Sequence, residues 1–205
     1  MRHFYYSIFA VVFSALVLFI SIYRITALKY HFSLPNDSSM GHAVFASGVE
    51  YSLPYPGILP NNPAWPLKAM RDRLDLYFTS DPLEKAQHTL FLADKRLVAA
   101  QQLAQSGDYG RGVATAAKAE QYLEEALTRG KDADVKGKNA VGFFETLYKA
   151  ALTHREVLEE MMANAPEDGK PVLNKTLDYS RNVKEQLEHL FNQRGKSVLT
   201  PARED

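Results

Sequence analysis

An unbroken run of twenty uncharged residues, residues 4–23, restricts what this chain can fold into more than any other feature. A helix rises about 1.5 Å per residue, so the run would extend about 30 Å, which matches the hydrocarbon core of a bilayer. Arg24 and Lys29 follow it and can extend their side chains into headgroups. We therefore predict a transmembrane signal anchor over residues 1–29.

A cleaved secretory signal is the alternative. Val44 and Ala46 would form a V-x-A cleavage site, but they lie more than twenty residues beyond the apolar run. That run is also longer than the apolar core of a usual signal peptide, about 7–15 residues. Basic residues on both sides of the run leave its orientation open. The short N-terminal side favours a single-pass protein of the cell membrane with an extracytoplasmic C-terminal domain.

Charge and cysteine content exclude several functions. Lys and Arg number 24, and Asp and Glu also number 24, so the chain lacks the positive field that nucleic-acid binding requires. The chain has no cysteine, which rules out disulfides, thiolate metal sites and thiol nucleophiles. The residues after the anchor suffice for one domain with a modest core.

Proline marks the segment after the anchor. Six of the ten prolines fall between Pro35 and Pro66. Proline removes backbone donors and favours extended conformations, so residues 30–63 are predicted to be a linker. Its second half should be stiff enough to hold the following domain away from the bilayer.

Helical patterns fill the rest of the chain. Apolar residues recur at steps of three and four, with charged residues between them. In the first helix these residues are Leu67, Met70, Leu74 and Tyr77 or Phe78. The sequence predicts an all-α fold: a transmembrane helix, a proline-rich linker, an antiparallel bundle of about five helices at residues 64–195, and a disordered tail at 196–205.

Start and stop signals place the helix ends. Asp81, Pro82 and Glu84 provide an N-cap, a proline at the first helical position and an acid at the third. Glycines near the ends favour left-handed C-terminal positions, and the polar stretch 131–139 is predicted to be a loop. The predicted helices run from Ala64 to Thr79 or Ser80, from Asp81 to Gly107, from Asp108 to Gly130, from Val141 to Pro166 and from Pro171 to Gly195.

Histidines offer the one candidate metal site. His88, His154 and His189 fall on three predicted helices, which a bundle can bring together. His154 lies on the apolar stripe of its helix, however, where a single hydrogen-bonded core histidine is the ordinary interpretation. No metal-binding spacing or nucleophile turn accompanies these residues. We therefore predict no metal, no cofactor and no enzymatic activity.

Aromatic residues gather around the proline-rich segment. Tyr51, Tyr55, Trp65 and Tyr77, together with Phe78, could form a surface that binds a partner. The same rings could instead pack the linker against the bundle, which is the more common outcome for large aromatic side chains.

Nearly all of the chain beyond the anchor resembles a prokaryotic family defined as a domain of unknown function. The resemblance rests on the motifs YSLPYPG, LKAMRDR, DPLEKA and ADKRL, at residues 51–57, 67–73, 81–86 and 93–97, with Trp65 between the first two. A later segment, residues 154–180, is similar to the family's fourth and fifth helices. The resemblance implies a membrane-anchored envelope protein with an external helical domain, and it implies no activity or catalytic residue.

Taken together, these patterns predict a non-enzymatic interaction or scaffold module of the cell envelope. Its partners would be the membrane and another envelope protein, a peptide or a wall component. The alternative is an envelope sensor in which a metal ion or stress ligand binds the helical bundle through the three histidines.

Overall fold

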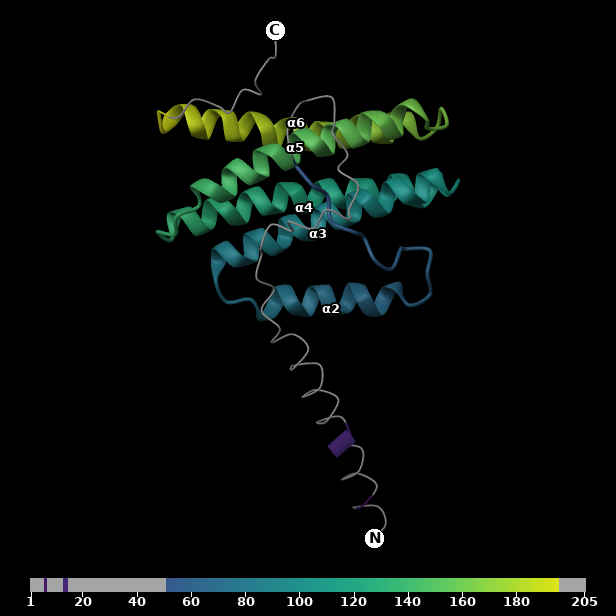
Figure 1. Ribbon diagram of the computed structural model, residues 1–205, viewed down its shortest axis with the longest axis horizontal. Coiled ribbons are helices and arrows are strands. Elements are labelled where there is room, and N and C mark those ends of the chain that lie inside the picture. The colour runs from purple at the N-terminus through teal and green to yellow at the C-terminus, as the bar shows by residue number, and fades with distance from the viewer. Residues whose placement is uncertain (1–5, 7–12, 15–50, 196–205) are drawn as a thin grey trace. The chain divides into compact units, whose positions relative to one another are not determined.

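The computed structural model describes residues 51–195 together with Tyr6, Phe13 and Ser14 (Figure 1). Nearly all of the predicted anchor, the first part of the predicted linker and the predicted tail lie outside these residues. Within them the chain forms five helices and no strand, so the all-α prediction is confirmed. The helices are α2 (Trp65–Phe78), α3 (Pro82–Gln105), α4 (Tyr109–Val135), α5 (Val141–Ala163) and α6 (Lys170–Gln193).

None of the helices in the described part of the chain combines the length and the apolar composition needed to cross a membrane.

Four helices enclose the core, and the fifth lies outside it. The helices α3 and α4 pack along each other, α6 packs against α4 and α5, and α5 also contacts α3 and α4. The helix α2 packs against α3, and Figure 1 shows it at the edge of the stack, on the side away from α5 and α6. The core is built mainly from leucine, alanine and phenylalanine side chains of α3 to α6.

Small residues bring α3 and α4 close together. Buried alanines of α3 share the two core clusters with buried alanines of α4: Ala93 with Ala126, and Ala100 and Ala104 with Ala116 and Ala119. At Gly112 of α4, an added Cβ would lie 3.1 Å from the carbonyl oxygen of Ala100 on α3. The two backbones therefore meet at a distance that only a very small residue accommodates.

The predicted start of α3 is confirmed. Asp81 is the N-cap, and its Oδ1 accepts hydrogen bonds from the backbone N–H groups of Leu83 (2.9 Å) and Glu84 (3.1 Å). Pro82 occupies the first helical position. Gly107 follows the helix with a φ of +88°, a left-handed conformation that glycine adopts without steric cost.

The predicted end of α4 at Gly130 is wrong. The helix continues to Val135, and the left-handed glycine that follows it is Gly137, with a φ of +80°. Gly130 is buried inside the helix, where an added Cβ would lie 2.4 Å from Cε1 of Phe143. This glycine makes room for an aromatic ring of α5, and the first part of the predicted loop at 131–139 is helical.

The apolar stripe of α2 faces outward. Leu67, Met70 and Tyr77 are exposed, whereas Asp72 and Leu76 on the opposite side of the helix are buried. The periodicity correctly predicts a helix, but α2 packs on α3 through a narrower and more polar face than its own apolar stripe.

Candidate functional site

A buried ionic network lies in the bundle and is centred on His154 of α5, whose side chain is inaccessible to solvent. Its Nδ1 lies 2.7 Å from Oε1 of Glu120 on α4, and its Nε2 lies 2.9 Å from Oδ1 of Asp94 on α3. The hydroxyl of Tyr51 donates to the other oxygen of Asp94, at 2.7 Å. One imidazole thus joins three helices, and one tyrosine attaches the proline-rich neck, residues 51–64, to them.

The histidine in this network is an imidazolium. Burial by itself lowers the pKa of His154, but the carboxylate of Glu120 and the hydrogen bonds to Asp94 and Glu120 outweigh it and raise the pKa to about 9. Both ring nitrogens then donate, each to a carboxylate oxygen. Burial and the Asp94 carboxylate also raise the pKa of Tyr51 well above its ordinary value, so its hydroxyl keeps the proton that it donates.

Sequence reasoning found the core position of His154 but not its partners. Asp94 and Glu120 are buried acids that directly follow Ala93 and Ala119 in otherwise apolar stripes. Asp94 lies between the buried Leu90 and Leu97, and Glu120 lies between the buried Ala116 and Leu123, each at a spacing of three or four residues. This register predicts burial of both acids. The sequence contains this signal for burial, but it does not show that either acid pairs with His154, which lies 34 residues after Glu120 and 60 residues after Asp94.

The network connects α3, α4 and α5, and through Tyr51 it attaches the neck to them. The imidazolium is paired with two carboxylates by direct hydrogen bonds, which burial of an ionised group requires, and one positive and two negative charges leave the three groups with a net charge of −1. Oε2 of Glu120 is buried and has no hydrogen-bond partner among the described residues. In Asp94, by contrast, both carboxylate oxygens accept hydrogen bonds, one from Tyr51 and one from His154.

A second set of contacts fastens the neck to α2. The ammonium of Lys68 donates to the backbone carbonyls of Pro56 (2.6 Å) and Ile58 (3.3 Å). Burial, followed by the nearby charge of Lys95, lowers the pKa of Lys68. Tyr51 and Lys68 therefore fix the neck at two points, one on α3 and one on α2.

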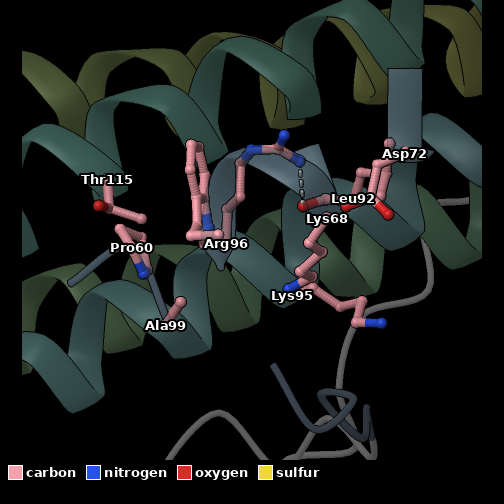
Figure 2. Close-up of a pocket in the computed structure, with 9 residues that line it drawn as sticks. Pro60, Lys68, Asp72, Leu92, Lys95, Arg96, Ala99 and Thr115 are labelled. Atoms are coloured by element: carbon pink, nitrogen blue, oxygen red, sulfur yellow. Dashed lines mark hydrogen bonds between the residues drawn. The ribbon is translucent and has the colours of Figure 1, made fainter. Parts of the chain in front are cut away.

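A small pocket lies where the neck and α2 meet α3 (Figure 2). Figure 2 shows Lys68 and Asp72 of α2 beside Lys95 and Arg96 of α3, and Arg96 Nη1 donates to the carbonyl of Leu92 at 3.3 Å. The cavity measures about 10 Å³, enough for about one water molecule. Ligand sites are usually some tens of times larger, so this pocket is too small for an organic substrate.

The three histidines occupy different environments. His88 on α3 is half-buried, and burial lowers its pKa. His189 on α6 is exposed, and His154 is enclosed by carboxylates. Within the part of the chain that the structure describes, no group of three or more His, Asp or Glu residues is arranged to hold a metal ion.

The aromatic residues considered for partner binding separate into two groups. Tyr51 is held by Asp94, and Trp65 is half-buried and lines the pocket between α2 and α3. Tyr55 is 65% exposed and Tyr77 is 78% exposed. Phe78, which was considered with them, is 56% exposed, so Tyr55, Tyr77 and Phe78 present most of their surface to solvent.

Tyr77 belongs to a continuous apolar surface, which we call the α2 stripe. It consists of five exposed residues on one face of the helix: Leu67, Met70, Leu74, Tyr77 and Phe78. The rings of Tyr77 and Phe78 meet edge to face, with their centroids 5.4 Å apart. Within residues 51–195, every exposed large hydrophobic residue lies between Tyr55 and Phe78 except Val135 and Val172. A concentration of this kind marks a binding surface more often than scattered exposed residues do.

Comparison with protein families gives one match. A family model described as a domain of unknown function (DUF5667) covers residues 57–168, more than half of the chain. The matched region contains α2 to α5 and the three helical members of the ionic network, but not Tyr51 or α6. Comparisons with curated proteins and with solved structures gave no match.

Proposed function

The chain belongs to the DUF5667 family, because the family model covers more than half of it. We propose that it is a membrane-anchored, extracytoplasmic module that binds another component of the cell envelope. The description of the family names no activity, so the proposal rests on the residues of this chain. It assigns residues 1–29 to the membrane, the neck to positioning, and the bundle to presenting a binding surface.

The observation that carries this proposal is the exposed α2 stripe. A helix of a soluble bundle normally turns its apolar stripe toward the core, because burying that area stabilises the fold. In α2 the stripe faces away from the bundle, and Leu67 is 68% exposed. Such an arrangement costs stability unless another surface covers the stripe.

A role without catalysis is supported by the burial and the mutual hydrogen bonding of the titratable groups in the network. His154, Asp94 and Glu120 have the residue types of an acid–base centre, but each is buried and bonded to another member of the network. A general acid or base must come within hydrogen-bond reach of its substrate. The small pocket beside Lys68 gives no room for one.

The two attachments of the neck support a positioning role. Tyr51 binds Asp94, and Lys68 binds two carbonyls of the neck. These two attachments hold the first half of the neck against α3 and α2, and α2 begins directly after the neck. The α2 stripe would therefore keep a defined orientation relative to the neck.

Membrane anchoring is tested by fractionating a bacterium that expresses the full-length chain. We expect the protein to stay in the membrane pellet after alkaline extraction and its C-terminus to be digested when protease is added to spheroplasts. The double variant Leu16→Arg/Leu18→Arg places two charges in the apolar run and should release the protein, because each charge opposes insertion by a few kcal/mol. The matched control is Leu16→Val/Leu18→Val.

Recovery of the intact full-length chain in the soluble cytosolic fraction would contradict the anchor. A protease-resistant C-terminus in spheroplasts, with the chain still in the pellet, would contradict the extracytoplasmic location alone.

A further inference from the structure

The α2 stripe has the geometry of a helix that lies in a surface. Each residue of an α-helix turns about 100° from the one before it, so the five residues of the stripe occupy about 100° of the circumference. The opposite side, with Asp72 and Leu76, is buried against the bundle. The stripe is therefore a flat apolar strip along the outside of the molecule, where Figure 1 shows α2 at the edge of the stack.

An arginine borders the stripe on each side. On a helical projection Arg71 lies about 40° beyond Leu67 on one side, and Arg73 lies about 40° beyond Tyr77 on the other. Both arginines are exposed. Arg71 also pairs with Asp72 at 3.0 Å, with 49% of its side-chain surface still exposed. The charged residue nearest the apolar strip is therefore an arginine on each side, with Asp75 about 40° beyond Arg71.

This charge pattern disfavours a second copy of the chain as the occupant. When two identical helices pack through the same stripe, residues at the edges of one lie opposite residues at the edges of the other. Because both edges carry arginine, parallel and antiparallel pairs alike would place Arg71 or Arg73 opposite an arginine. Like charges at an interface oppose association.

The same pattern suits a phospholipid surface. Apolar side chains of an interfacial helix enter the boundary between headgroups and acyl chains, and basic side chains at its edges reach phosphate groups. The guanidinium of arginine forms strong, paired hydrogen bonds with phosphate oxygens. Tyrosine and phenylalanine are also favourable at this depth, and Tyr77 and Phe78 lie at one end of the stripe.

Resting on the proposed membrane anchoring, we propose that α2 lies on the bilayer surface, with the α2 stripe in the interface and Arg71 and Arg73 at lipid phosphates. The uncharged run at residues 4–23 precedes α2 by about forty residues, so the anchor would keep the domain within reach of the membrane. On this proposal the proline-rich segment orients the domain at the bilayer surface, in place of holding it away as its stiffness predicts. The bundle would then meet the membrane through α2, with α5 and α6 on the far side of α3 and α4.

The chain has no cysteine, so a single labelling site can be introduced without background. Met70→Cys lies in the middle of the α2 stripe at a position that is 57% exposed. Val172→Cys on α6, at a position that is 47% exposed, is the matched control. Each full-length variant is labelled with an environment-sensitive fluorophore and reconstituted into vesicles of phosphatidylcholine with a minority of phosphatidylglycerol, with and without nitroxide-labelled lipid.

We expect nitroxide lipid to quench the probe at Met70 severalfold more strongly than the probe at Val172. Adding Arg71→Gln and Arg73→Gln should reduce the quenching at Met70, because the phosphate contacts are lost. The control pair, Arg111→Gln and Arg181→Gln, removes two exposed arginines of other helices and should leave the quenching unchanged.

Equal quenching at both positions, in chains that still float with the vesicles, would overturn the inference and leave the anchor standing. A probe at Met70 that is shielded from aqueous iodide but not quenched by lipid would show that protein covers the stripe, and it would also overturn the inference. A full-length chain that does not float with vesicles would contradict both the anchor and the surface contact.

Discussion

The imidazole Nδ1 of His154 lies 2.7 Å from Oε1 of Glu120, in a part of the bundle that excludes both side chains from solvent. With Asp94 on its other nitrogen, the histidine is the centre of charge pairing between α3, α4 and α5. This relationship makes the stability of the bundle sensitive to pH and to the loss of single charges.

The free energy of unfolding should fall as the pH rises through the pKa of His154. That pKa is about 9 in the folded protein, above the ordinary value of about 6.5 expected after unfolding. A raised pKa contributes stability that is fully present below about pH 6.5 and is lost as the pH rises through about 9, up to about 3 kcal/mol.

Urea denaturation of the full-length chain in detergent micelles, from about pH 6 to about pH 10, measures this loss. His154→Gln serves as the reference, because it cannot titrate in this range while all other groups remain. The difference in stability between the wild type and this variant should shrink with rising pH. A difference that stays constant would contradict an imidazolium in the core.

The two carboxylates should differ in how well they tolerate conversion to amides. Asp94→Asn replaces one of two oxygens that both accept hydrogen bonds, so a donor from Tyr51 or His154 is left without its acceptor. Glu120→Gln keeps an oxygen for Nδ1 and places its NH₂ where Oε2 has no partner among the described residues. We expect losses of about 3 kcal/mol and about 1 kcal/mol, respectively.

Each variant removes one negative charge, so a difference in stability between the two variants cannot come from the change in net charge. The free energy of unfolding at neutral pH gives the comparison. Equal losses, or a larger loss for Glu120→Gln, would mean that the number of accepted hydrogen bonds does not set the cost.

Tyr51→Phe should loosen the neck. The variant keeps the ring and removes the hydroxyl that donates to Asp94 at 2.7 Å, a bond to a charged acceptor worth roughly 1–3 kcal/mol. Limited proteolysis should then cleave residues 51–63 faster than in the wild type. Tyr55→Phe makes the same chemical change at a position that is 65% exposed, and its cleavage rate should be unchanged. Similar rates for both variants and the wild type would argue against a neck held by Tyr51.

Gly130→Ala should destabilise the bundle, although alanine is the better helix former. Its methyl group would lie 2.4 Å from Cε1 of Phe143 and 3.0 Å from Cε1 of Phe144. Overpacking of this kind costs about 1–3 kcal/mol, which exceeds the gain of about 1 kcal/mol from helix propensity. Thermal unfolding should show a lower midpoint.

Gly142→Ala is the matched control, since nothing lies within 4 Å of a Cβ at that exposed position of α5. It should leave the midpoint unchanged or raise it slightly. If the two variants behave alike, Gly130 does not make room for the ring.

Local sequence signals predicted the helices well, but they failed where a residue's role depends on a contact with a residue distant in the sequence. The cap formed by Asp81 depends on backbone groups two and three residues away, so it could be identified from neighbouring residues alone. Gly130 has the same side chain whether it ends a helix or makes room for a ring. Only the position of Phe143 distinguishes the two roles.

The ionic network shows the same division. The core position of His154 follows from the apolar residues around it, and the register of Asp94 and Glu120 marks both as buried. Their meeting does not follow, because it depends on how α3, α4 and α5 are placed against one another. The sequence could not predict which way the α2 stripe faces, because the spacing of an amphipathic helix is the same whether its apolar side faces the core or points away from it.

Helix content, the capped start of α3, the absence of thiol chemistry and an uncharged run long enough for a bilayer are all properties of neighbouring residues, and they could be read directly from the chain. Which buried charges pair, which glycine accommodates a ring and which apolar stripe faces away from the bundle depend on contacts between residues tens of positions apart. Those contacts form only when the helices pack, because packing alone fixes the distances on which hydrogen bonds and burial depend.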